Sequence, residues 1–80
     1  MNPREEENLV TCIHRMLTQY FKDLDGEKPS QIYEMLIGNV EKPMLEFVMQ
    51  RAGHNQSRAA EWLGINRNTL RKKLQQYGIE

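Results

Sequence analysis

The chain has 80 residues, of which 39% are apolar and 28% charged, and its formal net charge is zero. A chain of this length forms one domain at most and buries only a modest share of its surface when it folds alone. No apolar run approaches the roughly 20 residues that a membrane span requires. Cys12 is the only cysteine, and the polar start MNPREEEN is unlike a signal peptide. These features predict a small cytoplasmic protein without a membrane segment, and they favour an oligomer whose interface completes the core.

The two halves of the chain differ in charge. Residues 1–46 contain five Lys or Arg and nine Asp or Glu, which gives a balance of −4. Residues 47–80 contain six Lys or Arg and two Glu, which gives a balance of +4. Such an asymmetry indicates an anionic partner at the basic end.

Two helices are predicted in the first two thirds of the chain. Apolar residues recur at helical spacing from 8 to 24, and Asp25-Gly26 can close this helix in a left-handed conformation. Ser30 can cap a second helix, from about 31 to 52, which ends at Gly53. We expect Pro43 to kink this helix, and the alternative is two separate helices divided there.

The second helix has more apolar residues than one buried side can hold, which favours burial on two sides. In so short a chain, the second side is expected to meet another copy of the protein. These apolar residues are Ile32, Tyr33, Met35, Leu36, Ile37, Val40, Met44, Leu45, Phe47, Val48 and Met49.

The last 26 residues have the spacing of a helix-turn-helix. Asn55 can cap a short helix that ends at Leu63, Gly64 permits a sharp turn, and Asn66 can cap a helix to about Gln76. In the second of these helices we expect a buried side made of Leu70, Leu74 and Tyr77. We also expect Ile65 to point inward and Trp62 to lie in the core between the two helices. The opposite side is predicted to contain Thr69, Lys72, Lys73 and Gln76, with Arg67 and Arg71 beside it.

The outer side of such a helix can enter the DNA major groove. Two other interpretations of its basic residues are a solvated helix face and a helix on a membrane surface. The first is the usual one for basic residues that stand alone, but here they coincide with the caps and the turn. The second requires a free hydrophobic face, which the buried positions do not leave.

Residues 55–78, NQSRAAEWLGINRNTLRKKLQQYG, closely resemble the C-terminal end of the bacterial Fis family (factor for inversion stimulation). They resemble more loosely the DNA-binding end of NtrC-type activators. The likeness continues upstream through YFKDL, IYEML and VEKPMLEFVMQ with its proline, and so covers roughly residues 8–79, which favours Fis. It implies an all-α homodimer of four-helix subunits that intertwine through their first two helices. The two recognition helices would then lie too close for straight DNA, and the duplex would have to bend.

This resemblance implies three segments: a short polar segment (1–8), dimerisation helices (9–53) and a helix-turn-helix unit (54–80). It places the dimer interface on the apolar sides of the first two helices. The interface residues are predicted to be Leu17, Phe21, Ile32, Leu36, Val40, Met44, Phe47 and Val48.

The resemblance also implies which residues contact DNA. Asn66, Arg67, Thr69 and Lys72 match the family's recognition-helix contacts, and Asn55, Ser57 and Arg58 match residues that approach the DNA backbone. An arginine such as Arg67 can form a bidentate contact with guanine, and cations such as Lys73 supply the salt-dependent affinity. Arg71 either contacts phosphate or pairs with a nearby acid. The predicted DNA-binding set is Asn55, Ser57, Arg58, Asn66, Arg67, Thr69, Arg71, Lys72 and Lys73.

The predicted function is therefore sequence-tolerant binding and bending of double-stranded DNA by a transcription regulator of the bacterial nucleoid. RNA polymerase or other transcription proteins are further expected partners. No nucleophile–base arrangement or phosphate loop indicates an enzyme, and His14 and His54 lack the spacing of metal ligands, so no metal or cofactor is expected. The alternatives are a helical dimeric protein-interaction module and the DNA-binding domain of an NtrC-type activator. MNPREEEN does not resemble the β-hairpin arm of some Fis proteins, so stimulation of DNA invertases is not expected.

Overall fold

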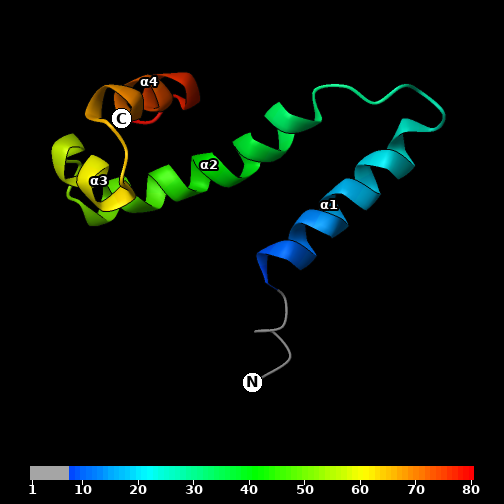
Figure 1. Ribbon diagram of the computed structural model, residues 1–80, viewed down its shortest axis with the longest axis horizontal. Helices are drawn as coiled ribbons and strands as arrows, with labels where there is room; N and C mark the ends of the chain where they lie inside the picture. Colours follow the sequence, from blue (N-terminus) through cyan, green and yellow to red (C-terminus); the bar gives the residue numbers. More distant parts are fainter. Residues whose placement is uncertain (1–7) are drawn as a thin grey trace. The chain divides into compact units, whose positions relative to one another are not determined.

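The computed structural model describes residues 8–80, which form four helices and no strand (Figure 1). The helices are α1 (Leu9–Leu24), α2 (Ile32–Arg51), α3 (Gln56–Leu63) and α4 (Arg67–Tyr77). The predicted all-α class is confirmed. The predicted polar segment 1–8 lies outside the described residues except for Asn8. In the part that is described, no helix has the length and apolar character needed to cross a membrane.

The chain divides into two compact units, one up to residue 36 and one from residue 37 to residue 80, so that α2 contributes to both. In the first unit, α1 begins at the Asn8 cap, whose Oδ1 accepts a hydrogen bond from the Thr11 N–H at 3.0 Å. It ends at Asp25, which adopts the left-handed conformation predicted for this position. None of its side chains is fully buried, although its apolar residues occur at helical spacing.

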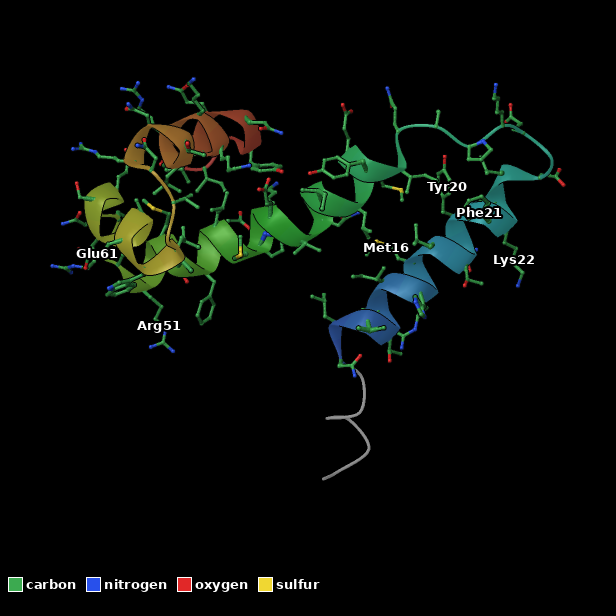
Figure 2. All side chains as sticks on the ribbon, viewed as in Figure 1. Met16, Tyr20, Phe21, Lys22, Arg51 and Glu61 are labelled. Atoms are coloured by element: carbon green, nitrogen blue, oxygen red, sulfur yellow. The ribbon has the colours of Figure 1, made fainter. Side chains whose placement is uncertain are left out.

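The loop between α1 and α2 is attached to α1 by Tyr20. The Tyr20 hydroxyl donates a hydrogen bond to the Ser30 carbonyl at 2.9 Å and accepts one from the Ser30 N–H at 3.1 Å. The Tyr20 ring also meets Phe21 edge-on, with ring centroids 5.5 Å apart (Figure 2). The two hydrogen bonds between Tyr20 and Ser30 fix the end of the loop just before α2.

Helix α2 differs from the prediction at its start, and it continues through the proline. Ser30 is not the cap: the residue before the helix is Gln31, which has φ +56° and whose carbonyl accepts from the Met35 N–H. The backbone of Ser30 is already bound to Tyr20, and the helix begins one residue later. Pro43 lies inside a continuous helix, so the alternative of two separate helices is wrong.

The fully buried core lies entirely in the second unit. Helix α2 contributes one side of its C-terminal half, and α3 and α4 cover that side. The fully buried residues are Leu45, Met49, Ala52, Ala59, Ala60, Leu70 and Leu74. Burying a large aliphatic side chain contributes about 1.5–3 kcal/mol each, so this small cluster is the main source of stability for residues 37–80.

Trp62 was predicted to lie in this core, and that prediction is wrong. Its side chain is 55% exposed. The inner side of α3 is occupied by Ala59, Ala60 and the partly buried Leu63, and Trp62 lies outside this set. At about 100° per residue, Trp62 points well away from the side of α3 that these three residues form, so its indole lies outside the core.

Candidate nucleic-acid interface

Helix α3 begins where the sequence predicts. The Asn55 Oδ1 accepts a hydrogen bond from the Arg58 N–H at 3.0 Å and so satisfies one of the unpaired donors of the first turn. Ser57 and Arg58 are exposed in that turn. The cap uses only the asparagine oxygen, and its NH₂ group remains a donor for another acceptor.

The turn between α3 and α4 is made by Gly64 and Ile65. Gly64 has φ +75°, and its N–H donates to the Ala60 carbonyl at 2.9 Å and the Glu61 carbonyl at 3.2 Å. The next N–H, of Ile65, reaches back to the Ala60 carbonyl at 3.1 Å, which completes a Schellman cap. Ile65 packs against the core, as predicted, and this contact fixes the direction in which the chain enters α4.

Helix α4 begins at Asn66, whose Oδ1 accepts from the Asn68 N–H at 2.7 Å. Leu70 and Leu74 are 0% and 2% exposed, so one side of α4 faces the core and the other faces solvent. Figure 2 shows nitrogen-bearing side chains projecting from α4 on the side away from α2. The spacing of the buried leucines therefore determines which residues of α4 are available to a partner.

The structure exposes eight of the nine residues predicted to bind DNA: Asn55, Ser57, Arg58, Asn66, Arg67, Thr69, Arg71 and Lys72. They occupy the first turn of α3 and the first six residues of α4, with the caps that precede them. Asn68 is exposed in the same stretch and was not predicted. It lies four residues before Lys72 on the helix, and this spacing was the sequence signal that could have identified it.

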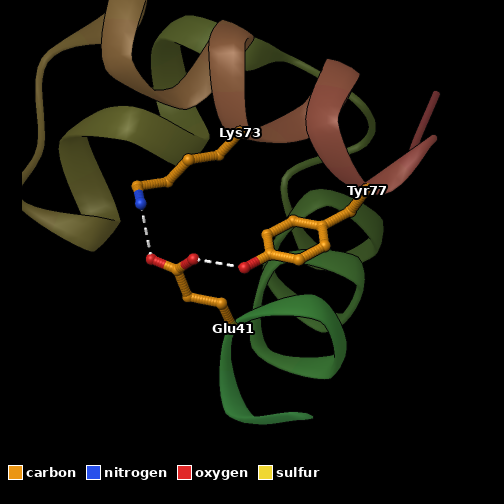
Figure 3. A network of polar contacts seen from close by, with 3 residues as sticks. All are labelled: Glu41, Lys73 and Tyr77. Atoms are coloured by element: carbon orange, nitrogen blue, oxygen red, sulfur yellow. Dashed lines mark hydrogen bonds and ion pairs between the residues drawn. The ribbon is translucent and has the colours of Figure 1, made fainter. Parts of the chain in front are cut away.

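Lys73 does not lie on the outer side of α4, and that part of the prediction is wrong. Its Nζ lies 2.6 Å from the Glu41 Oε2, and the other carboxylate oxygen accepts a hydrogen bond from the Tyr77 hydroxyl at 2.6 Å (Figure 3). Glu41 is on α2, so this network joins α2 to α4. We call these three residues the α2–α4 clamp.

The clamp is partly shielded from solvent, with side-chain exposures of 31% for Lys73 and 18% for Glu41. Hydrogen bonds from Lys73 and then from Tyr77 lower the pKa of Glu41 below its ordinary value, and partial burial opposes this effect. The carboxylate is therefore ionised at neutral pH. Glu41 neutralises Lys73, which the sequence predicted to bind DNA. The two residues are 32 positions apart in the chain, so no local sequence pattern indicated this ion pair.

Arg71 was expected either to contact phosphate or to pair with an acid. It is exposed, and no carboxylate in residues 8–80 forms an ion pair with it. Within residues 8–80, the structure therefore excludes the alternative in which Arg71 pairs with an acid.

By its fold and by this surface, the protein is a helix-turn-helix protein. Residues 37–77 match the family described as bacterial regulatory protein, Fis family. A protein of Ralstonia nicotianae that is named as Fis-like and DNA-binding is 59% identical over 68 residues, which are 85% of this chain and 88% of that protein. Similarly named proteins of Neisseria meningitidis serogroups A and B are 51% identical over 77 residues, covering 96% of this chain and 98% of each relative. The chain belongs to the Fis family.

Proposed function

We propose that this protein binds double-stranded DNA through α4 and the start of α3, as a dimeric regulator that bends the duplex in the bacterial nucleoid. The observation that carries the proposal is the exposure of Arg67, Thr69, Arg71 and Lys72 on a helix whose other side is buried. The names of the relatives, which describe them as DNA-binding, support the same partner.

Each exposed residue has a role that its chemistry allows. Arg67 is at the N-terminal end of α4, where a guanidinium reaching a base edge can make a bidentate contact with guanine O6 and N7. Lys72 and Arg58 neutralise phosphates, and Ser57, Thr69 and the cap amides donate uncharged hydrogen bonds to phosphate oxygens. Phosphate contacts position the helix, and Arg67 contributes the discrimination between bases.

The proposed homodimer is supported by the exposure of the predicted interface. Phe21, Met44 and Phe47 are 51%, 43% and 59% exposed in the single chain. The other predicted interface residues, Leu17, Ile32, Leu36, Val40 and Val48, are only partly buried. A second copy that covers these side chains would complete the core that one chain lacks.

The predicted division into dimerisation helices (9–53) and a DNA-binding unit (54–80) remains part of this proposal. One addition follows from the packing: Leu45, Met49 and Ala52 of α2 belong to the core beneath α3 and α4. The dimer interface would therefore use the other sides of α2. Two helix-turn-helix units attached to one dimer body could bend the DNA between them.

The test uses Arg67→Ala, with Gln75→Ala as the matched control, because Gln75 is an exposed residue of α4 outside the proposed contact set. In gel-shift titrations at moderate salt, Arg67→Ala should weaken binding to a specific site by about tenfold or more while Gln75→Ala changes little. A permuted-site assay with the unaltered protein should show bending. Equal affinities for Arg67→Ala and the unaltered protein would exclude this surface from DNA recognition.

A second candidate function is a helical dimeric module that recruits another protein, and the exposed Phe47 and Trp62 favour it. The two functions are separated by the same titration. A protein-interaction module would lose no DNA affinity when Arg67 is removed, whereas the DNA-binding regulator would.

A further inference from the structure

The α2–α4 clamp neutralises one cation in the basic half of the chain. Residues 47–80 have a charge balance of +4, and Glu41 belongs to the acidic half, residues 1–46. Its Oε2 atom lies 2.6 Å from the Lys73 Nζ (Figure 3). The ammonium of Lys73 is therefore occupied by a carboxylate of the same chain, in the way that a DNA phosphate would occupy it.

Lys73 lies on the flank of the surface that we propose to bind DNA. It follows Lys72 directly, and it lies four residues after Thr69, which is an offset of only about 40° around the helix. Thr69 and Lys72 are both exposed. The long stem of a lysine can direct its ammonium to either side of such a position, and Figure 3 shows the Lys73 stem extended toward Glu41 on α2. The ion pair, and not the position of Lys73 on α4, thus directs this ammonium away from the proposed DNA-binding surface.

Glu41 is held in place by a second contact. Its other carboxylate oxygen accepts a hydrogen bond from the Tyr77 hydroxyl at 2.6 Å. The Tyr77 ring lies beside Gly38 of α2, where an added Cβ would be 3.8 Å from the Tyr77 Cε1. Because the carboxylate is already fixed, its pair with Lys73 loses less side-chain entropy than a pair of two free surface residues would. A phosphate that approached Lys73 would also meet the negative charge of Glu41.

We propose that Glu41 acts as an internal substitute for a DNA phosphate: it occupies Lys73 and thereby limits the number of phosphates that each chain neutralises. This inference rests on the proposed DNA binding through α4 and adds a residue of α2 that sets its strength. Glu41 is then a positioning residue for Lys73 and does not itself touch DNA. Because phosphate contacts are independent of base sequence, the loss of one lowers the affinity for all DNA alike and leaves the discrimination by Arg67 unchanged.

The salt dependence of DNA affinity tests this role, with Glu41→Gln as the variant. The glutamine keeps the shape of the side chain and an oxygen that can accept from Tyr77, but it has no charge to hold Lys73. In fluorescence-anisotropy titrations of a labelled duplex, the freed lysine should steepen the slope of log affinity against log salt by about 0.9 per chain, or about 1.8 for the proposed dimer. Affinity at low salt should rise about tenfold or more. A purely structural role for Glu41 predicts the opposite, because a weakened fold would bind DNA less tightly.

Two control variants assign the gain to Lys73. The double variant Glu41→Gln, Lys73→Gln should return the slope to that of the unaltered protein. Glu46→Gln removes the same charge from an exposed position of the same helix and should change the slope little. Glu41→Ala repeats the main measurement with the residue most favourable to a helix, and it replaces Glu41→Gln if circular dichroism shows that the glutamine variant does not fold.

Three results would overturn the inference. The first is an unchanged slope in the folded Glu41→Gln or Glu41→Ala variant. The second is an equal increase in Glu46→Gln, because the gain would then come from the lost acidic charge and not from Lys73. The third is a steep slope that persists in the double variant. A failure of the proposed function is distinct from all of these, because it would appear as undiminished DNA binding by Arg67→Ala.

Discussion

We expect the α2–α4 clamp to make Lys72 and Lys73 contribute unequally to DNA binding, and replacing each lysine with glutamine tests this expectation. Lys72 is exposed, whereas the Lys73 ammonium lies 2.6 Å from the Glu41 carboxylate. Each phosphate neutralised by a protein cation contributes about −0.9 to the slope of log affinity against log salt. Two copies of Lys72 in the proposed dimer should therefore account for about 1.8 units of slope, and Lys73 for almost none.

The assay is a fluorescence-anisotropy titration of a labelled DNA duplex at several salt concentrations. We expect Lys72→Gln to flatten the slope by nearly two units and Lys73→Gln to leave it within experimental error. Lys73→Gln has a separate cost of about 1 kcal/mol in stability because Glu41 loses its ion-pair partner. Circular dichroism melts of both variants confirm that the titrations compare folded proteins. A loss of slope in Lys73→Gln as large as that in Lys72→Gln would refute the clamp as the reason for the difference.

Three further predictions concern stability. Because its pKa is lowered in the folded state, Glu41 stabilises the fold fully above its ordinary pKa of 4.5 and loses this contribution as the pH falls through the lowered value. In urea titrations, the variant Glu41→Gln should therefore be less stable than the unaltered protein at neutral pH, and its stability should depend less on pH in the acid range. Gly64→Ala should cost about 1–2 kcal/mol in thermal unfolding because φ is +75°, although a Cβ there would meet no atom within 4 Å; an unchanged melting temperature would contradict the strain argument. Leu70→Ala should cost about 2–5 kcal/mol, which hydrogen exchange would register as lost protection throughout α4, and protection that persisted would contradict the role of Leu70 in the core.

Local rules were sufficient to predict the helix-turn-helix from the sequence. An asparagine cap, a glycine in the left-handed conformation and leucines four residues apart are features of a few neighbouring residues. Asn55, Gly64 and Asn66 accordingly adopt the predicted roles. The exposed residues of α4 followed from the same reasoning, because burial of Leu70 and Leu74 determines which side faces outward.

Features that depend on distant partners could not be predicted in this way. A lysine such as Lys73 is expected on the exposed side of α4, but it pairs with Glu41, which lies 32 residues earlier in the chain. Trp62 has the size and hydrophobicity of a core residue, but Ala59, Ala60 and Leu63 form the side of α3 that faces the core. Gln31 precedes α2 in place of Ser30 because Tyr20 binds the Ser30 backbone on both its donor and its acceptor.

The breadth of the apolar stripe on α2 now has a physical explanation in two parts. Leu45 and Met49 face the core beneath α3 and α4, whereas Met44 and Phe47 on the neighbouring positions remain exposed. A helix that packed against one core only would need Leu45 and Met49 alone. Exposing Met44 and Phe47 to water would then be unfavourable, with no interaction to offset it. If a second copy covers the outer side, the same helix fixes both the dimer and the recognition unit. A change in how two copies associate would then be transmitted through α2 to the spacing of the two α4 helices.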